Sequence, residues 1–73
     1  MKTIETAKAP AAIGPYSQAY EINGVLYTSG QIPIDPDSGS IPKGIAEQTE
    51  QSCKNVGAIL EAAGLGFENV FKT

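Results

Sequence analysis

The sequence predicts a small α+β domain, and three observations support this. Asn23-Gly24 lies between two β-rich runs, and this dipeptide is the strongest short-range signal for a β-hairpin. Apolar residues recur at three- and four-residue steps over residues 45–63, as they do on one face of a helix. Residues 70–73 are typical of the start of a strand. We therefore expect a hairpin and the start of a further strand packed on one helix, as a single domain over residues 1–73.

Two segments are expected to be irregular. Residues 1–17 contain prolines and a glycine, which predict an extended lead-in broken by turns. Residues 30–44 hold three more prolines and the string DPDSGS at 35–40, a dense turn signal. That string superficially resembles a calcium loop, but Ala46 stands where the final glutamate ligand belongs. A plain surface turn is therefore the favoured interpretation.

The hairpin has a definite expected register. A two-residue type I′ turn at Asn23-Gly24 fixes which residues lie opposite each other, because side chains alternate between the two faces of a strand. The expected cross-strand pairs are Ile22 with Val25, Glu21 with Leu26, Tyr20 with Tyr27 and Gln18 with Ser29. Both faces of the hairpin would then carry some apolar surface.

The helix is expected to bury one continuous stripe. Its members would be Ile45, Thr49, Cys53, Val56, Ile59, Leu60 and Ala63. Gly64 follows directly, as the glycine that commonly ends a helix. In this arrangement Cys53 is a buried packing residue, because it lies on the apolar stripe and the chain has no histidine to activate a nucleophile.

Composition excludes several classes of function. The formal charge is −3, and the chain has no arginine, no histidine and one cysteine. It cannot build a Ser-His-Asp triad, a tetrahedral zinc site or an internal disulfide from its own residues. The acidic balance argues against a nucleic-acid partner. No apolar run is long enough for a membrane span or a signal peptide, so we expect a cytoplasmic protein without a membrane partner.

Isolated polar residues leave their roles open. Ser17 and Ser29 could be nucleophiles only with a base from elsewhere, and as lone hydroxyls they more commonly bond the backbone or a ligand. Tyr16 follows Gly14-Pro15 directly before the hairpin, where it could either pack or bind a ligand. Composition and spacing by themselves support no enzyme assignment.

Three strings in fixed order give a more specific indication. They are AIGPYSQA at residues 12–19, then TSGQIP at 28–33 with Asp35-Pro36 and Gly39 beyond, then Gln48-Thr49 leading a helix with Asn55 and ILEAAG at 59–64. Together they resemble the YjgF/RidA family of reactive-intermediate deaminases, also catalogued as endoribonuclease L-PSP or translation-inhibitor-like proteins. The resemblance runs from about Pro10 to Thr73.

The resemblance implies a fold and an activity. Members of the family have about twice this length and a chorismate-mutase-like α+β fold, in which a sheet packs on two helices. They form homotrimers with a site at each subunit interface. They hydrolyse enamines or imines, such as 2-iminobutanoate and 2-iminopropanoate, to 2-keto acids and ammonia, without a metal or an organic cofactor. Residues 1–73 would be the N-terminal half of such a domain.

The resemblance also implies which residues bind substrate. Tyr16 and Ser29 would hydrogen-bond the ligand, and Gly30 would offer its backbone N–H to the substrate carboxylate. The family's catalytic arginine and glutamate come from the C-terminal half, so no catalytic residue is expected in this chain. Two alternatives stay open: a non-catalytic module that binds a small metabolite or a partner, and, with less support from the charge, an endoribonuclease or translation inhibitor.

Overall fold

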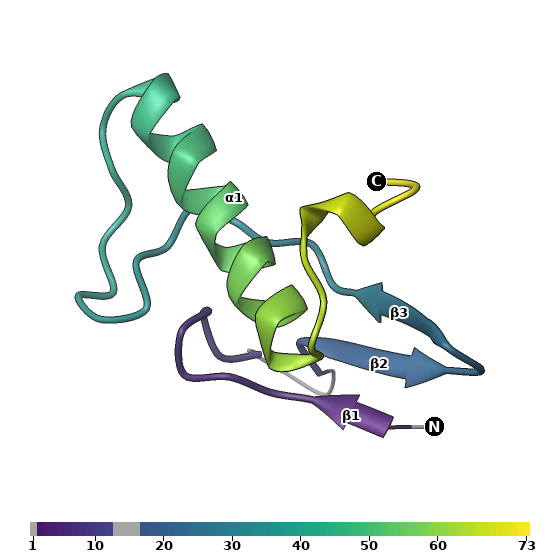
Figure 1. Ribbon diagram of the computed structural model, residues 1–73. Coiled ribbons are helices and arrows are strands. Elements are labelled where there is room, and N and C mark those ends of the chain that lie inside the picture. Colours follow the sequence, from purple (N-terminus) through teal and green to yellow (C-terminus); the bar gives the residue numbers. More distant parts are fainter. Residues whose placement is uncertain (1, 13–16) are drawn as a thin grey trace.

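The computed structural model describes residues 2–12 and 17–73. Within them lie strands β1 (Lys2–Ile4), β2 (Ala19–Ile22) and β3 (Val25–Thr28), helix α1 (Ile45–Ala62) and the 3₁₀-helix η1 (Phe67–Asn69). The strands form an antiparallel sheet in the order β1-β2-β3. Helix α1 crosses one face of this sheet, and η1 follows it back toward β3 (Figure 1). The expected α+β architecture is confirmed.

The hairpin forms as the sequence predicts. Asn23 and Gly24 have φ values of 51° and 81°, the left-handed conformation that a type I′ turn requires at both central positions. The register pairs Ile22 with Val25 and Tyr20 with Tyr27, as expected. Beyond the strand ends, the Ser29 N–H donates to the Gln18 carbonyl at 2.9 Å, which confirms the next pair.

The third strand lies at the opposite end of the chain from the one expected. Lys2–Ile4 forms β1 and pairs with β2, placing Ile4 opposite Ala19. The interpretation of residues 1–17 as an extended lead-in is therefore wrong for residues 2–4. Three residues are too few to show an alternating pattern, and their partner strand is distant in sequence.

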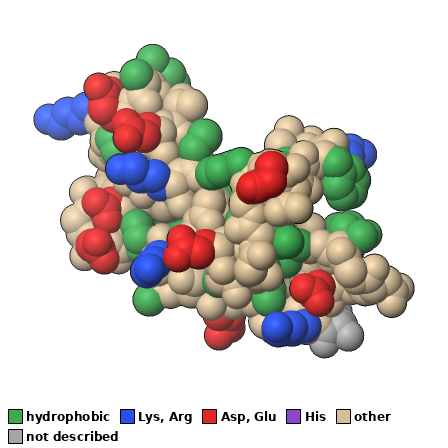
Figure 2. Space-filling view, viewed as in Figure 1, with side chains coloured by type: hydrophobic (Ala, Val, Ile, Leu, Met, Phe, Trp, Pro, Cys, Tyr) green, Lys and Arg blue, Asp and Glu red, His purple; other side chains and the backbone are tan. Residues whose placement is uncertain are grey.

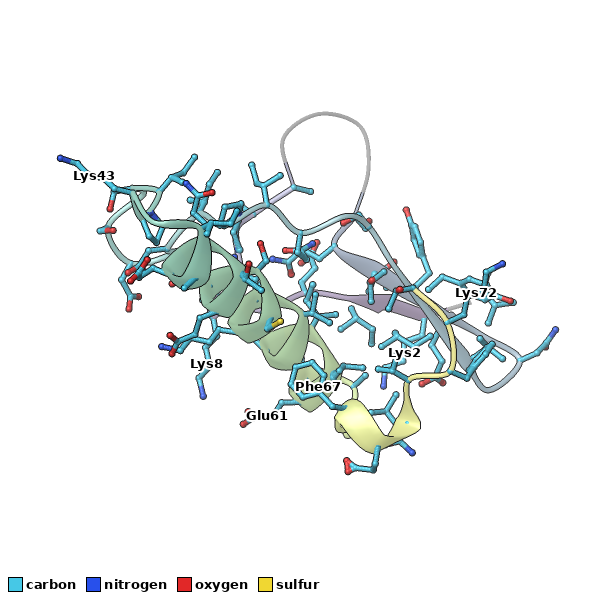
Figure 3. The ribbon with its side chains drawn as sticks, turned by 90° about the horizontal axis from the view of Figure 1, so that it is seen from above. Lys2, Lys8, Lys43, Glu61, Phe67 and Lys72 are labelled. Atoms are coloured by element: carbon cyan, nitrogen blue, oxygen red, sulfur yellow. The ribbon has the colours of Figure 1, made fainter. Side chains whose placement is uncertain are left out.

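Residues 70–73 form no strand. Instead η1 turns the chain just before them, with the Val70 N–H bonded to the Phe67 carbonyl at 3.0 Å. A strand exists only with a neighbour to pair with. Phe67 packs against α1, close enough that a Cβ at Gly57 would lie 3.1 Å from the ring (Figure 3).

Helix α1 begins and ends close to the predicted positions. It starts at Ile45 and ends at Ala62, one residue before the expected end. Gly64 follows with a φ of 78°. The Leu65 N–H donates to the Leu60 carbonyl at 2.8 Å and the Gly64 N–H to the Glu61 carbonyl at 2.9 Å. These two bonds define a Schellman motif, which satisfies carbonyls at the end of the helix.

The buried face of α1 differs from the expected stripe. Ile59 and Leu60 are buried, but Ile45 is 80% exposed. Cys53 is also exposed, so its interpretation as a buried packing residue is wrong. The sheet lies beside the C-terminal part of the helix (Figure 1), and the N-terminal part therefore has no strand to pack on.

The core is small and the surface carries many apolar side chains. Ile4, Ala9, Ala19 and Ile59 form the buried cluster. The large apolar side chains that remain exposed are Ile22, Tyr27, Ile32, Ile41, Ile45, Leu65, Phe67, Val70 and Phe71. Figure 2 shows hydrophobic groups spread between charged ones over the face in view. The accessible surface is 5176 Å², against about 4,300 Å² expected for a compact monomer of 7.6 kDa.

In residues 2–12 and 17–73, no helix combines the length and the apolar composition needed to cross a bilayer.

Candidate functional site

A small pocket lies where strand β3 ends. Its volume is about 50 Å³, and it is lined by residues 10–12, Gln18, residues 29–32 and Ile34. Of the three substrate-binding residues expected from the sequence, Ser29 and Gly30 line this pocket together. Tyr16 lies outside the described residues. Two segments far apart in sequence thus meet at the position where the resemblance places the ligand.

The Ser29 side chain has two protein partners. Its Oγ donates to the Gln18 carbonyl at 3.1 Å and accepts from the Gln31 side-chain amide at 3.2 Å. The same Gln31 nitrogen donates to the Ser29 carbonyl at 3.3 Å. Because both partners are close and the residue is half-buried, the hydroxyl is held in one orientation.

Gly30 gives the pocket an open side. The residue is exposed, and a Cβ built on it would meet no atom within 4 Å. A ligand group can therefore approach the Gly30 backbone closely, as an anion binding to a main-chain N–H must do.

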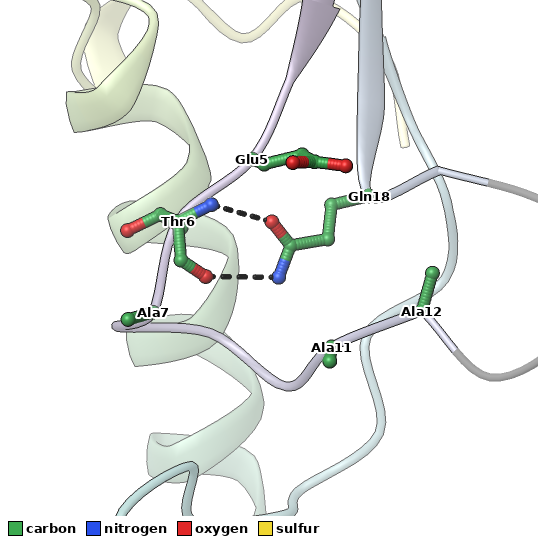
Figure 4. A pocket seen from close by; sticks show the side chains of 6 residues that line it. All are labelled: Glu5, Thr6, Ala7, Ala11, Ala12 and Gln18. Atoms are coloured by element: carbon green, nitrogen blue, oxygen red, sulfur yellow. Dashed lines mark hydrogen bonds between the residues drawn. The ribbon is translucent and has the colours of Figure 1, made fainter.

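Gln18 is a site residue that sequence reasoning did not identify. It is only 4% exposed, and its side chain ties the segment before the pocket to β2. Its Oε1 accepts from the Thr6 N–H at 2.7 Å and its Nε2 donates to the Thr6 carbonyl at 3.1 Å (Figure 4). The Nε2 also donates to the Ala9 and Pro10 carbonyls. Nothing in a single sequence distinguishes this glutamine from an exposed one, since its partners come from a distant segment.

Asn55 fixes the other wall of the pocket. It is fully buried in the middle of α1, and its Nδ2 donates to the Ile32 carbonyl at 3.0 Å and the Ile34 carbonyl at 2.9 Å. Gln51, one turn earlier, donates to the Asn55 Oδ1 at 2.9 Å. The helix thus holds the loop after β3 in place through hydrogen bonds to its backbone. Asn55 was part of the family resemblance, but the sequence did not indicate this bonding role.

The pocket is electrically neutral. Its lining residues, all within the described ranges, include none with a charged side chain. A larger hollow of about 460 Å³ adjoins it, lined by residues 5–7, 11–12 and Gln18 (Figure 4). Glu5 in that hollow would repel an anion, so the smaller pocket suits a carboxylate better. Within residues 2–12 and 17–73, no three potential metal-ligating side chains of His, Cys, Asp or Glu come together.

The other singled-out residues lie away from this pocket. Ser17 donates from its Oγ to the Tyr20 Oη at 3.1 Å, and Tyr20 pairs with Tyr27 across the hairpin. The string at residues 35–40 forms a hydrogen-bonded turn, in which the Gly39 N–H donates to the Asp35 carbonyl at 2.8 Å. These contacts are structural.

Comparison with known proteins identifies close relatives. The family model of endoribonuclease L-PSP matches residues 6–73. The chain is 55% identical over 73 residues to 2-iminobutanoate/2-iminopropanoate deaminase of Mus musculus, covering 99% of this chain and 54% of that protein. It is 51% identical over 72 residues to the Escherichia coli K12 protein of the same name, covering 99% of this chain and 56% of that protein.

Solved structures agree with the sequence relatives. E. coli TdcF with bound serine superposes with a TM-score of 0.89 at 48% identity, covering 92% of this chain and 53% of that one. A putative endoribonuclease from Thermotoga maritima gives 0.91 at 49% identity, covering 96% of this chain and 56% of that one. The chain spans about half the length of the curated relatives it matches. On this similarity over nearly all its residues, the chain belongs to the endoribonuclease L-PSP family, also known as the YjgF/RidA family.

Proposed function

We propose that residues 1–73 form the N-terminal half of an imine deaminase. The enzyme would hydrolyse 2-iminobutanoate and 2-iminopropanoate to the corresponding 2-keto acids and ammonia. The observation that carries the proposal is the neutral pocket of Ser29 and Gly30, in a chain 55% identical to a protein named for that activity.

The reaction suits a site without a protein nucleophile. An imine carbon is already electrophilic, so water can attack it directly. The water oxygen becomes the keto oxygen, and the nitrogen leaves as ammonia with the two protons of the water. The protein has to orient the substrate, stabilise charge on it and position the water.

The three site residues would share the task of binding. Gly30 would offer its backbone N–H to the substrate carboxylate, at the side of the pocket where no Cβ intervenes. Ser29 and Tyr16 would hydrogen-bond the rest of the ligand. A volume of about 50 Å³ is well below the roughly 300–1,000 Å³ typical of small-molecule sites. This supports the view that another part of the protein, or a second subunit, completes the site.

The proposal also requires a positive charge to bind the substrate carboxylate. A carboxylate is bound most strongly by an arginine, and this chain has none. The arginine would therefore come from outside residues 1–73, and the family resemblance implies that the general base does too. The exposed apolar side chains support further contacts, made by another part of the protein or by another subunit, and the family resemblance implies a homotrimer. The acidic composition supports a protein without a nucleic-acid partner, and the free thiol of Cys53 suits the reducing cytoplasm.

The test is the rate of 2-oxobutanoate formation from 2-iminobutanoate, generated in situ by a threonine dehydratase. We expect the complete protein to exceed the spontaneous rate and residues 1–73 alone to match it. Turnover by residues 1–73 alone would contradict the need for an arginine. If the complete protein binds 2-oxobutanoate without turnover, it is the non-catalytic binding module instead.

A further inference from the structure

We propose that the Ser29 hydroxyl acts only as a hydrogen-bond acceptor toward the ligand, because the Gln18 backbone carbonyl takes its proton. Ser29 would then bind the nitrogen of the imine and leave its carboxylate to other groups. The inference rests on the proposed function, since it concerns the same pocket and substrate. It adds the direction of one hydrogen bond and the group that sets it.

The orientation of the Gln31 amide follows from its partners. One nitrogen, Nε2, lies 3.3 Å from the Ser29 carbonyl oxygen and 3.2 Å from the Ser29 Oγ. A carbonyl oxygen can only accept, so the group facing it must be the NH₂ end of the amide. That nitrogen has two protons and no acceptor capacity. The Ser29 Oγ therefore accepts from Gln31.

The proton of the Ser29 hydroxyl already has a partner within the protein. The Oγ lies 3.1 Å from the Gln18 carbonyl oxygen, which can only accept. A hydroxyl has one proton and two lone pairs. The Ser29 hydroxyl donates its proton to the Gln18 carbonyl and accepts from the Gln31 amide with one lone pair. A single lone pair therefore remains for a ligand. The Ser29 hydroxyl can therefore accept a hydrogen bond from a ligand, but it has no free proton to donate to one.

Only one part of the substrate supplies a donor. The carboxylate oxygens of a 2-imino acid accept hydrogen bonds, whereas the protonated imine nitrogen donates them. Holding that proton favours the iminium form, whose carbon is the better electrophile for water. The keto acid product carries an oxygen at the same position, which accepts. The site would thus prefer the substrate to the product and favour product release.

The test compares two stable probes that differ at this position. L-2-aminobutanoate presents an ammonium donor on C2, and 2-oxobutanoate presents a carbonyl acceptor on C2. Calorimetry on the complete protein gives the ratio of their dissociation constants, oxo acid over amino acid. In Ser29→Ala the acceptor is removed, so this ratio should fall about fivefold. Gln31→Met frees a lone pair but leaves the hydroxyl proton on the Gln18 carbonyl, so its ratio should not fall.

Ser38→Ala is the matched control. It removes the same hydroxyl, which lies 2.7 Å from the Ser40 Oγ in an exposed turn, but Ser38 lines neither pocket. Its ratio should equal that of the wild type. A folded Ser29→Ala protein with an unchanged ratio overturns the proposal, and a ratio that falls in Gln31→Met overturns it equally, because the Gln18 carbonyl would then not hold the proton. A wild type that neither binds the probes nor hydrolyses imine refutes the proposed function and this inference with it, whereas normal hydrolysis with an unchanged ratio refutes the inference alone.

Discussion

Two buried amides connect segments that are distant in sequence. Gln18 holds the N-terminal segment and Asn55 holds the loop after β3, each through backbone groups of the other segment. A buried polar group left without its partner costs about 1–3 kcal/mol, which is large beside the contribution of a small core. These side chains therefore stabilise the walls of the pocket as well as the fold.

Replacing Gln18 should destabilise the protein strongly. In Gln18→Leu the Thr6 N–H and the three carbonyls lose their partner, and the bond to the Ala9 carbonyl is buried. We expect a loss of at least about 2 kcal/mol in the free energy of unfolding, measured by urea denaturation. Gln48→Leu removes one bond at the half-buried start of α1, and its loss should stay below about 1 kcal/mol. Equal losses in the two variants would contradict the special role of Gln18.

Gly30→Ala should separate binding from stability. A Cβ there meets no atom within 4 Å, and Gly30 does not have a positive φ, so the free energy of unfolding should change by less than about 0.5 kcal/mol. The added methyl group would stand where the carboxylate has to approach the backbone. The affinity of the complete protein for 2-oxobutanoate should therefore fall. An unchanged affinity would place the carboxylate elsewhere.

Cys53 provides a direct check of the corrected helix face. Because its side chain is exposed, we expect the native protein to react with a thiol reagent as fast as the unfolded protein does. Cys53→Ser should change the free energy of unfolding by less than about 0.5 kcal/mol. Slow labelling and a large destabilisation would restore the buried position that the sequence suggested.

At the scale of elements, the sequence predicted those features that depend on contacts within one turn of the chain. The Asn23-Gly24 turn sets its own backbone conformation and with it the register of β2 and β3. Gly64 likewise ends α1 through bonds within one turn. Strand β1 and the full buried face of α1 depend on contacts with distant segments: the sequence predicted the burial of Ile59 and Leu60, but neither β1 nor the burial of Asn55. The same division applies to the pocket. The resemblance singled out Ser29 and Gly30, whereas the hydrogen bonds of the Gln18 and Asn55 amides became apparent only from their partners.

The end of α1 can be tested at Gly64. Its φ of 78° disfavours any residue with a Cβ, so Gly64→Ala should cost about 1 kcal/mol of unfolding free energy. Asparagine tolerates this conformation better than alanine does. Gly64→Asn should therefore be the less damaging change, as measured by thermal unfolding. The reverse order would show that the helix does not end in a Schellman motif.

At the scale of the whole molecule, the surface is too large for the size of the core. The accessible area of 5176 Å² exceeds the expected value of about 4,300 Å² by roughly a fifth, and the excess includes side chains such as Phe71 and Ile45. We expect residues 1–73 on their own either to associate or to unfold without a sharp transition. Sedimentation velocity combined with scanning calorimetry would decide between these outcomes. A monomer in the centrifuge that also melts in one cooperative step would mean that the buried amides and the small core suffice, and that the apolar surface needs no partner.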